Sequence, residues 1–469
     1  MAGHILSKST FIRAGQCVKS LYLNKFHGNL RDRISPEQLA KFRRGTDIGK
    51  LARDLFPGGV DMSPKSPTQY QKKVEETALA ILNPEISVIY EAVVQFNGVL
   101  IMLDILKRNE EGWIAYEVKS SLSISETYLT DAALQYYVLH GAAIYIHDFH
   151  LVYMNRDYTF TGELALNELF TSISVFEQVK SRCVEIENDV ALFKQTLLSG
   201  IVPEVPIGLQ CNYPYTCDFK GFCWKNVPKT SILNLNEFPS EQLFDWFNHG
   251  ICQPGQIPAE AIETQLQQEQ IRSLVLNKPY FATETLKNNL FPLRNVKTAF
   301  VKAILHRPAL PLIIGSKPYQ PQLLSLVITG DGETIETHFF HQSGNQVGIN
   351  IMEKISLLVE SYQKIVMYDA TDFKQFLLYQ NDTNLLEKII DIKDILRDST
   401  FYHPHVDRYM DFENVAKSLL QKPFYMKNET YLIADILAEP AGNNSIHNAL
   451  KQYILIMHQL FKLLNFEVI

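Results

Sequence analysis

The chain has 469 residues and a formal net charge of −7, with 46% hydrophobic and 20% charged residues. A single hydrophobic core stops growing near about 250–300 residues, so this length predicts two domains. The composition excludes an intrinsically disordered chain, and the acidic balance argues against a protein coated in positive charge for non-specific nucleic-acid binding.

The first residues hold no continuous apolar stretch of the signal-peptide type, and no segment approaches the roughly 20 apolar residues of a membrane helix. We therefore expect a cytoplasmic protein with no membrane partner. Because the cytoplasm is reducing, the six cysteines are expected to be free thiols or metal ligands rather than disulfides.

Positive charge is concentrated near the N-terminus. Residues 1–53 contain eleven Lys or Arg against three Asp or Glu, a local balance of +8. Such a segment can follow a phosphate backbone. A solvated helical face explains the same charges.

The first domain, residues 1–230, is expected to alternate between helices and strands. Ser35 and Pro36 suit the start of a helix, and Asn97-Gly98 suits a hairpin turn between two strands of period two. The expected elements are helices at 36–56 and 67–82, an antiparallel meander at 87–96, 99–108 and 112–121, a helix at 125–141, a strand at 143–155 and a long helix at 166–198.

The remaining chain divides into a connector and a second domain. Residues 231–275, rich in Gln, Glu, Asn and Pro, look like a helical connector, and residues 276–469 regain α/β character. We find no internal repeat, low-complexity run or Gly-rich phosphate loop. The strands expected in the second domain lie at 279–292, 323–329, 337–341 and 364–369.

Two carboxylates and a lysine are expected to converge in the meander. Alternation places Glu117 and Lys119 on one face of their strand, and Asp104 is central in the neighbouring, otherwise apolar strand. Mg²⁺ or Mn²⁺ prefers oxygen ligands, which Asp104, Glu117 and the Val118 carbonyl could supply, while Lys119 could orient an attacking water. A solvated strand face also explains an E-x-K pair, but an unpaired carboxylate in an apolar strand is costly and indicates a function.

The acidic residue, the E-x-K pair and a following helix with a Gln-Tyr motif resemble the RecB-like branch of the PD-(D/E)XK nucleases, similar to CRISPR-associated and AddB-type nuclease domains. The resemblance implies a restriction-endonuclease-like fold and metal-dependent cleavage of DNA. The site residues that it implies are Asp104 and Glu117 as metal ligands, Lys119 as the catalytic lysine, and Gln135 with Tyr136 or Tyr137 as the helical motif that contacts substrate or supports the site.

Two further positions bear on this resemblance. Glu91 matches an acidic position often present on the preceding strand, where a surface carboxylate is the alternative. Gly49 stands where many relatives carry a metal-binding His on the first helix. The missing ligand implies the loss of a second metal or of some catalytic rate.

Three cysteines, Cys211, Cys217 and Cys223, recur with gaps of five residues in a turn-rich segment, and Cys17 lies at the opposite end of the first domain. One N-terminal and three C-terminal cysteines resemble the iron-sulfur RecB-like nucleases, in which these ligands hold a [4Fe-4S] cluster that joins the ends of the domain. The gap between the first two departs from the CxxC common in that branch. Four thiolates also suit Zn²⁺, and spacing alone does not separate the two metals.

The two other cysteines, Cys183 and Cys252, are expected to be ordinary packed thiols.

The second domain resembles the DEDD exonuclease group of the ribonuclease-H-like fold. That motif has Asp-x-Glu on a first strand, where this chain keeps Glu284 but has Ala282. Asp372 and Asp394 lie near further acids of the family, and Met457 replaces the last one. Two lost ligands predict a degenerate site, because the remaining charges hold a metal poorly. A different α/β domain with surface acids is the alternative.

We thus expect an α/β protein with a PD-(D/E)XK restriction-endonuclease-like domain and a ribonuclease-H-like domain, an order that resembles an uncharacterised bacterial family over nearly the full chain. The expected function is Mg²⁺- or Mn²⁺-dependent hydrolysis of phosphodiester bonds, with DNA favoured as the partner and single strands or ends as the substrate. A nucleic-acid-binding scaffold without turnover and a zinc-stapled interaction protein are the alternatives.

Overall fold

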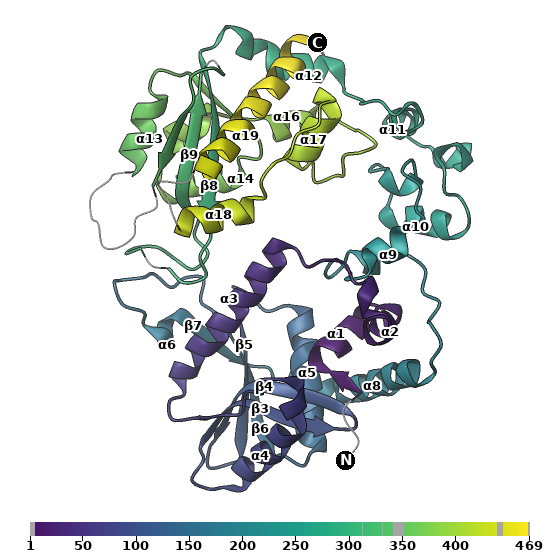
Figure 1. Cartoon of the computed structure of the whole chain (residues 1–469), viewed down its shortest axis with the longest axis vertical. Coiled ribbons are helices and arrows are strands. Elements are labelled where there is room, and N and C mark those ends of the chain that lie inside the picture. The colour runs from purple at the N-terminus through teal and green to yellow at the C-terminus, as the bar shows by residue number, and fades with distance from the viewer. Residues whose placement is uncertain (1–4, 312, 331, 341–350, 439–443, 468–469) are drawn as a thin grey trace. The chain divides into compact units, whose positions relative to one another are not determined.

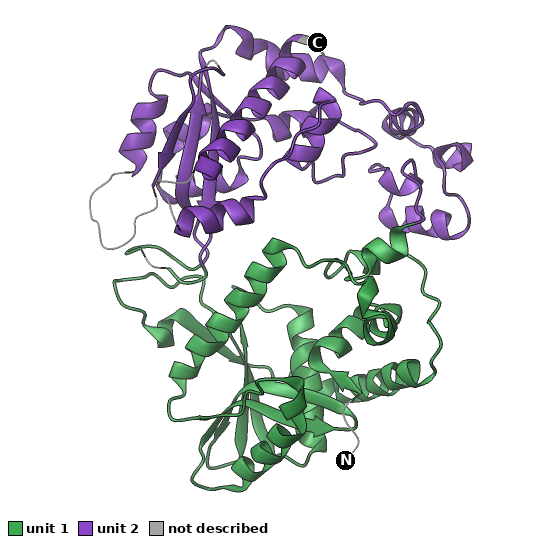
Figure 2. Cartoon of the chain, in the orientation of Figure 1, with its two compact units in different colours: residues 1–225, 309–318 green, residues 226–308, 319–469 purple. Residues whose placement is uncertain are grey.

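The computed structural model describes residues 5–311, 313–330, 332–340, 351–438 and 444–467. The chain divides into two compact units (Figure 2). Unit 1 comprises Met1–Lys225 and Ala309–Pro318, and unit 2 comprises Asn226–Pro308 and Tyr319–Ile469. The expected connector therefore falls inside unit 2.

Unit 1 is built on a mixed seven-stranded sheet of order β2-β3-β4-β5-β6-β7, in which β1 also pairs with β4. Strands β3, β4 and β5 form an antiparallel meander, β6 runs parallel to β5, and β7 is antiparallel to β6. The strands are β1 (Leu6–Ser7), β2 (Val60–Asp61), β3 (Val88–Phe96), β4 (Val99–Arg108), β5 (Trp113–Lys119), β6 (Ile146–Met154) and β7 (Phe170–Ser174).

Helix α5 is the central helix of unit 1, and every residue from 131 to 139 is buried. It connects the parallel strands β5 and β6 and packs against the sheet and against α1, α7 and α8, whereas α3 packs on β5 (Figure 1). The helices are α1 (Lys8–Gln16), α2 (Val18–Phe26), α3 (Pro36–Ala52), α4 (Tyr70–Leu82), α5 (Glu126–Gly141), α6 (Leu166–Leu169), α7 (Phe176–Ser181), α8 (Cys183–Leu198) and α9 (Lys220–Trp224).

Local sequence signals explain most of these elements. Ser35 caps α3 by accepting a hydrogen bond from the Gln38 amide, and Pro36 occupies the first turn. Asn97 and Gly98 both have positive φ, as the tight turn between β3 and β4 requires. The meander, the helix at 125–141 and the strand after it are confirmed.

The expected long helix at 166–198 is wrong. This segment contains α6, β7, α7 and α8. The sequence Phe-Thr-Ser-Ile-Ser of β7 is rich in β-branched and hydroxyl residues, and it pairs with the open edge of β6. Pairing with an existing strand edge outweighed the helical spacing of the apolar residues around it.

Unit 2 contains a five-stranded sheet of order β10-β9-β8-β11-β12. Strands β8, β9 and β10 are antiparallel neighbours, and β11 runs parallel to both β8 and β12. The strands are β8 (Thr298–His306), β9 (Gln322–Thr329), β10 (Glu336–Phe339), β11 (Lys364–Met367) and β12 (Ile389–Asp391).

Both faces of this sheet are covered by helices (Figure 1). Alternation along β8 sends Phe300 and Ile304 into one core with α19, and Val301 and Ala303 into the other core with α13 and α14. The helices of unit 2 are α10 (Ser240–Asn248), α11 (Gln265–Leu276), α12 (Thr283–Leu290), α13 (Ile351–Val359), α14 (Thr371–Tyr379), α15 (Thr383–Lys388), α16 (Ile392–Asp398), α17 (Phe412–Leu420), α18 (Glu429–Ala438) and α19 (Asn444–Lys462).

The strand expected at 279–292 is also wrong, because this segment forms α12. Leu286 and Leu290 are four residues apart and wholly buried, which is the spacing of one helical face. The first long strand of unit 2 is β8 instead. The strands expected at 323–329 and 364–369 are confirmed as β9 and β11, and β10 covers residues 337–339 of the third.

None of the helices in the described ranges combines the length and the apolar character that a membrane span requires.

Candidate functional site

Three carboxylates lie in one row across the meander of unit 1. Ile105 pairs with Tyr116, and continuation of this register sets Asp104 opposite Glu117. On the other side, the pairs that flank Glu91 set it opposite Asp104. Opposed residues of antiparallel strands share a face, so the three side chains approach one another.

Glu117 is the most deeply buried of these carboxylates, with 2% of its side chain exposed. Its Oε1 atom accepts hydrogen bonds from Lys119 Nζ and Lys8 Nζ, each at 2.7 Å. Its Oε2 atom accepts from Gln135 Nε2 at 2.8 Å. Both oxygens are therefore compensated by donors that come from three different elements.

Helix α5 presents Asp131 and Gln135, four residues apart, to this network. Lys119 Nζ lies 2.5 Å from Asp131 Oδ2, and Lys8 Nζ lies 3.6 Å from the same atom. The remaining oxygens, Asp131 Oδ1 and Gln135 Oε1, are buried and have no hydrogen-bond partner within the described chain. Buried acceptors without a donor are costly, so these two call for a cation or an ordered water.

The tyrosines of the helical motif do not reach the network. Tyr136 stacks on His140 and meets Phe176 edge-on. The Tyr137 hydroxyl accepts a hydrogen bond from Asn97 Nδ2 at 2.9 Å. Successive helical residues point about 100° apart, so the side chains of Gln135 and Tyr136 leave α5 in different directions.

The charges of the network shift one another's pKa values. Burial and the nearby Glu117 raise the pKa of Asp104 from 3.8 to about 8. Burial alone would raise the pKa of Glu117, but the ammonium groups of Lys119 and Lys8 outweigh it and hold that pKa below its usual range. Burial would lower the pKa of Lys119, yet Glu117 and Asp131 raise it. The raised pKa favours the protonated form of Asp104, and the lowered pKa favours the ionised form of Glu117.

Asp104 is also anchored to the neighbouring strand, because its Oδ2 atom accepts a hydrogen bond from the Val118 amide at 2.7 Å. Glu91 has a φ of 50°, a conformation that non-glycine residues rarely adopt. Its Oε1 atom accepts from Arg53 at 3.0 Å, and burial still raises the Glu91 pKa. Gly49 lies in α3, where an added Cβ would meet nothing within 4 Å.

Two residues of this network, Lys8 and Asp131, are not among the site residues predicted from the sequence. The sequence contains a signal for Asp131, because it lies four residues before Gln135 and therefore on the same face of the predicted helix. It contains no signal for Lys8, because 109 residues separate Lys8 from Glu117.

The four cysteines Cys17, Cys211, Cys217 and Cys223 line one cavity of about 20 Å³ in unit 1. Burial raises the pKa of the Cys17 and Cys223 thiols, and the neighbouring thiols raise both further. Cys183 and Cys252 do not line this cavity; the first begins α8 and the second lies in unit 2.

Hydrogen bonds join the same two chain segments around the cavity. Gln16 Nε2 donates to the Gln210 carbonyl at 2.7 Å and to the Tyr215 carbonyl at 2.6 Å. Arg13 and Arg31 both lie 2.7 Å from Asp218 Oδ2. Residues 13–31 and residues 210–218 of unit 1 thus meet at the cysteines.

Within the described ranges, no group of three or more His, Cys, Asp or Glu side chains is placed to hold a metal ion. The donor types nevertheless differ sharply between the two sites. The cysteine cavity offers four soft thiols, as iron-sulfur clusters and zinc require. The row on the meander offers hard carboxylate oxygens, which Mg²⁺ and Mn²⁺ prefer.

The acids predicted for unit 2 lie on three separate helices, and no hydrogen bond or ion pair between described residues joins any two of them. Glu284 on α12 pairs with Lys287 at 3.3 Å, and Asp372 on α14 pairs with Arg307 at 2.5 Å. Asp394 on α16 pairs with Lys374 at 2.9 Å and with Arg397 at 2.8 Å.

The buried acid of this region is Asp391, which accepts hydrogen bonds from the amides of Asp369 and Ala370. At the middle of β8, Lys302 pairs with Glu429 at 2.8 Å. Met457 is fully buried in α19. Lys302 and Asp391 are therefore already engaged by a carboxylate and by backbone amides, and the position of Met457 holds no acid.

Comparison with family models finds no match, and comparison with curated proteins finds none either. Among solved structures, the crystal structure of SSO0001 aligns with 48% of this chain and 87% of its own, at 12% sequence identity and a TM-score of 0.24. A TM-score at this level carries no argument about fold or function.

Proposed function

We propose that unit 1 is a Mg²⁺- or Mn²⁺-dependent nuclease of the PD-(D/E)XK type that hydrolyses phosphodiester bonds, with single strands or ends of DNA as its substrate. The observation that carries the proposal is the convergence of Asp104, Glu117 and Lys119 from adjacent strands, with Gln135 supporting Glu117 from the next helix. A buried ionised carboxylate beside a protonated one is a costly arrangement, and such arrangements concentrate at functional sites.

Each residue has a role in this proposal. Asp104 and Glu117, with the Val118 carbonyl, would hold the cation, which polarises the scissile phosphate and lowers the pKa of an attacking water. Lys119 neutralises charge on the phosphate or orients the water. Gln135 donates to Glu117 Oε2 and so fixes the orientation of that carboxylate. The unpartnered Asp131 Oδ1 and Gln135 Oε1 fit a cation or its water ligands nearby.

We propose that the four cysteines hold a structural [4Fe-4S] cluster. Two chain segments about 190 residues apart meet there, and four thiols line the same cavity. A cluster ligated from both segments would add metal binding to the free energy of folding. Zinc on the same thiols is the alternative, and a colourless protein with one zinc per chain would establish it.

For unit 2 we propose a ribonuclease-H-like fold without metal chemistry. The sheet order, with three antiparallel strands followed by two parallel ones, supports this fold. The dispersal of Glu284, Asp372 and Asp394 into separate ion pairs supports the loss of a catalytic site.

One observation favours the rival function, a nucleic-acid-binding scaffold without turnover. Lys8 donates to Glu117 Oε1, and its positive charge stands beside the carboxylates that a metal would need. If Lys8 replaces the cation permanently, the site is a buried ion-pair network and the basic N-terminal segment serves binding alone.

A cleavage assay separates the two functions. Labelled single- and double-stranded DNA is incubated with anaerobically purified protein and Mg²⁺ or Mn²⁺, alongside Glu117→Gln. Glu110→Gln is the matched control, because Glu110 is exposed in the turn that follows β4. Cleavage by the wild type and by the control, but not by Glu117→Gln, supports the nuclease. DNA binding without metal-dependent cleavage in all three establishes the scaffold.

A further inference from the structure

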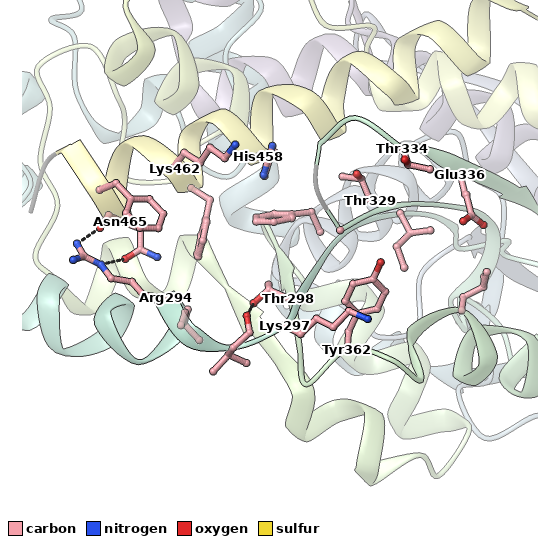
Figure 3. Close-up of a pocket in the computed structure, with 18 residues that line it drawn as sticks. Arg294, Lys297, Thr298, Thr329, Thr334, Glu336, Tyr362, His458, Lys462 and Asn465 are labelled. Carbon is pink, nitrogen blue, oxygen red and sulfur yellow. Dashed lines mark hydrogen bonds between the residues drawn. The ribbon is translucent and has the colours of Figure 1, made fainter.

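Unit 2 contains a pocket of about 540 Å³, a volume that suits a small-molecule ligand (Figure 3). It opens between the first part of β8, the end of β9 and the C-terminal part of α19. In Figure 3, Lys462 and His458 approach from α19, while Lys297 and Tyr362 stand on the opposite side. None of the acids predicted for unit 2 lines this pocket.

Among the described residues of the lining, basic side chains outnumber acidic ones. Lys462 and Lys297 are exposed, and neither makes an ion pair with a described residue. Lys297 Nζ instead lies 5.1 Å from the Tyr362 ring centroid. Within the described residues, the lining contains the carboxylate of Glu336, whose Oε2 atom lies 3.3 Å from His338 Nε2. In an acidic protein, a group of cations that forms no ion pair with a described carboxylate favours an anionic ligand.

Arg294 is the third cation, and it is held in place rather than neutralised. Its Nε atom donates to Asn465 Oδ1 at 3.1 Å, and its guanidinium lies 5.1 Å from the Phe466 ring centroid. Asn465 is wholly buried, and its Nδ2 atom has no acceptor within the described chain. Because Oδ1 faces Arg294, Nδ2 points away from it (Figure 3). A buried amide without an acceptor calls for a ligand oxygen.

The floor of the pocket is aromatic. Phe300 is buried and meets Phe461 edge-on with ring centroids 5.2 Å apart, and Tyr362 contributes a half-buried ring. Threonine hydroxyls at 298, 329 and 334 add polar groups to the wall. Cations at the mouth together with rings at the floor suit a ligand that has both a phosphate and a flat base.

We propose that this pocket binds a nucleoside phosphate, with the phosphate between Lys462, Lys297 and Arg294 and the base against the aromatic floor. The ligand is either a free nucleotide or the phosphorylated end of a strand, since both offer the same chemistry. Such a site would make unit 2 a nucleotide-binding unit that needs no metal. The proposal is independent of cleavage by unit 1, because the test measures binding alone.

The test is isothermal titration calorimetry on the full chain without added divalent metal. The probes are thymidine 5′-monophosphate, thymidine, inorganic phosphate and a 5′-phosphorylated oligothymidylate. The variants are Lys462→Ala and, as a matched control on the same helix, Lys451→Ala, whose side chain is exposed and outside the pocket. Both lysines are exposed, so neither change should disturb folding.

The nucleotide should bind the wild type and the control equally and bind Lys462→Ala about tenfold more weakly, the usual effect of losing a hydrogen bond to a charged group. Thymidine and phosphate should each bind more weakly than the nucleotide. Oligonucleotide binding that exceeds nucleotide binding and also depends on Lys462 identifies a strand end as the ligand. Nucleotide binding that exceeds oligonucleotide binding identifies a free nucleotide. The proposal is overturned if the nucleotide does not bind, if phosphate binds as tightly, or if the two variants behave alike.

Discussion

Replacement of Lys8 by Met removes one of two ammonium groups from a network whose charges balance at neutral pH. Lys8 and Lys119 carry two positive charges, Glu117 and Asp131 carry two negative charges, and burial raises the pKa of Asp104 to about 8, which keeps it protonated. Methionine keeps most of the side-chain volume. Its main effect is therefore to leave a net negative charge in the buried site.

The size of the effect follows from these contacts. Removal of one partner from a buried ion pair costs about 3–5 kcal/mol. The lower figure applies here, because Glu117 keeps Lys119 and Gln135 and the Lys8 side chain is 30% exposed. For a unit of this size, about 3 kcal/mol lowers the melting temperature by roughly 6–12 °C.

Differential scanning calorimetry in a chelating buffer measures this shift, and the two units are expected to give separate transitions. Lys25→Met is the matched control, because Lys25 is exposed in α2 and pairs with no carboxylate in the described chain. Millimolar Mn²⁺ should then stabilise Lys8→Met more than the wild type, since a cation between Asp104 and Glu117 restores the lost charge.

Two results would contradict this reasoning in different ways. A free energy of unfolding for Lys8→Met within about 0.5 kcal/mol of the wild-type value would refute the buried network, because surface substitutions produce changes of that size. A destabilised variant that gains no more from Mn²⁺ than the wild type does would keep the network but refute the cation site.

The remaining predictions concern the cluster, the acid pair and the second unit. Cys17→Ser should lose iron and sulfide as completely as Cys217→Ser, whereas Cys183→Ser should retain both. Metal analysis measures this, and iron retained by Cys17→Ser would exclude a cluster that joins the two ends of the segment 1–230. Burial raises the pKa of Asp104 above its unfolded value, so the folded state holds a proton that the unfolded state releases between about pH 4 and 8. In metal-free buffer, Asp104→Asn should therefore gain stability relative to the wild type as pH rises through that window. Denaturant titrations measure the unfolding free energies, and a difference between variant and wild type that stays constant with pH would contradict the raised pKa. Asp104→Ala should abolish cleavage and leave DNA binding intact, while Glu284→Gln should cleave like the wild type; activity that survives the first change and disappears with both would locate the chemistry in unit 2.

Local sequence signals were sufficient for most strands and helices of unit 1. Asn97-Gly98 defined a tight turn, and that turn fixed the register of β3 against β4. Within the meander, the two-residue alternation of side chains and the register of the strands are enough to predict that Asp104 approaches Glu117. These predictions depended on residues close together in the chain.

The failures arose where a distant partner decided the local structure. Residues 170–174 became β7 because β6 offered an open edge. The segment around Glu284 became a helix because Leu286 and Leu290 could bury one face in unit 2. In both segments the local pattern fitted two structures, and long-range pairing or burial selected one.

The sequence by itself therefore determined the meander and the two carboxylates that face each other on it, because the side-chain alternation of a strand and the chemistry of a turn act over a few residues. Only the tertiary structure brought Lys8 from α1 to Glu117 and set Asp131 beside Lys119. It also gathered the pocket of unit 2 from η8 (Phe291–Asn295), from the strands β8, β9 and β10, and from the helices α13 and α19. No periodicity links such residues. Their meeting is decided by which faces must be buried together and by which buried charges must be compensated.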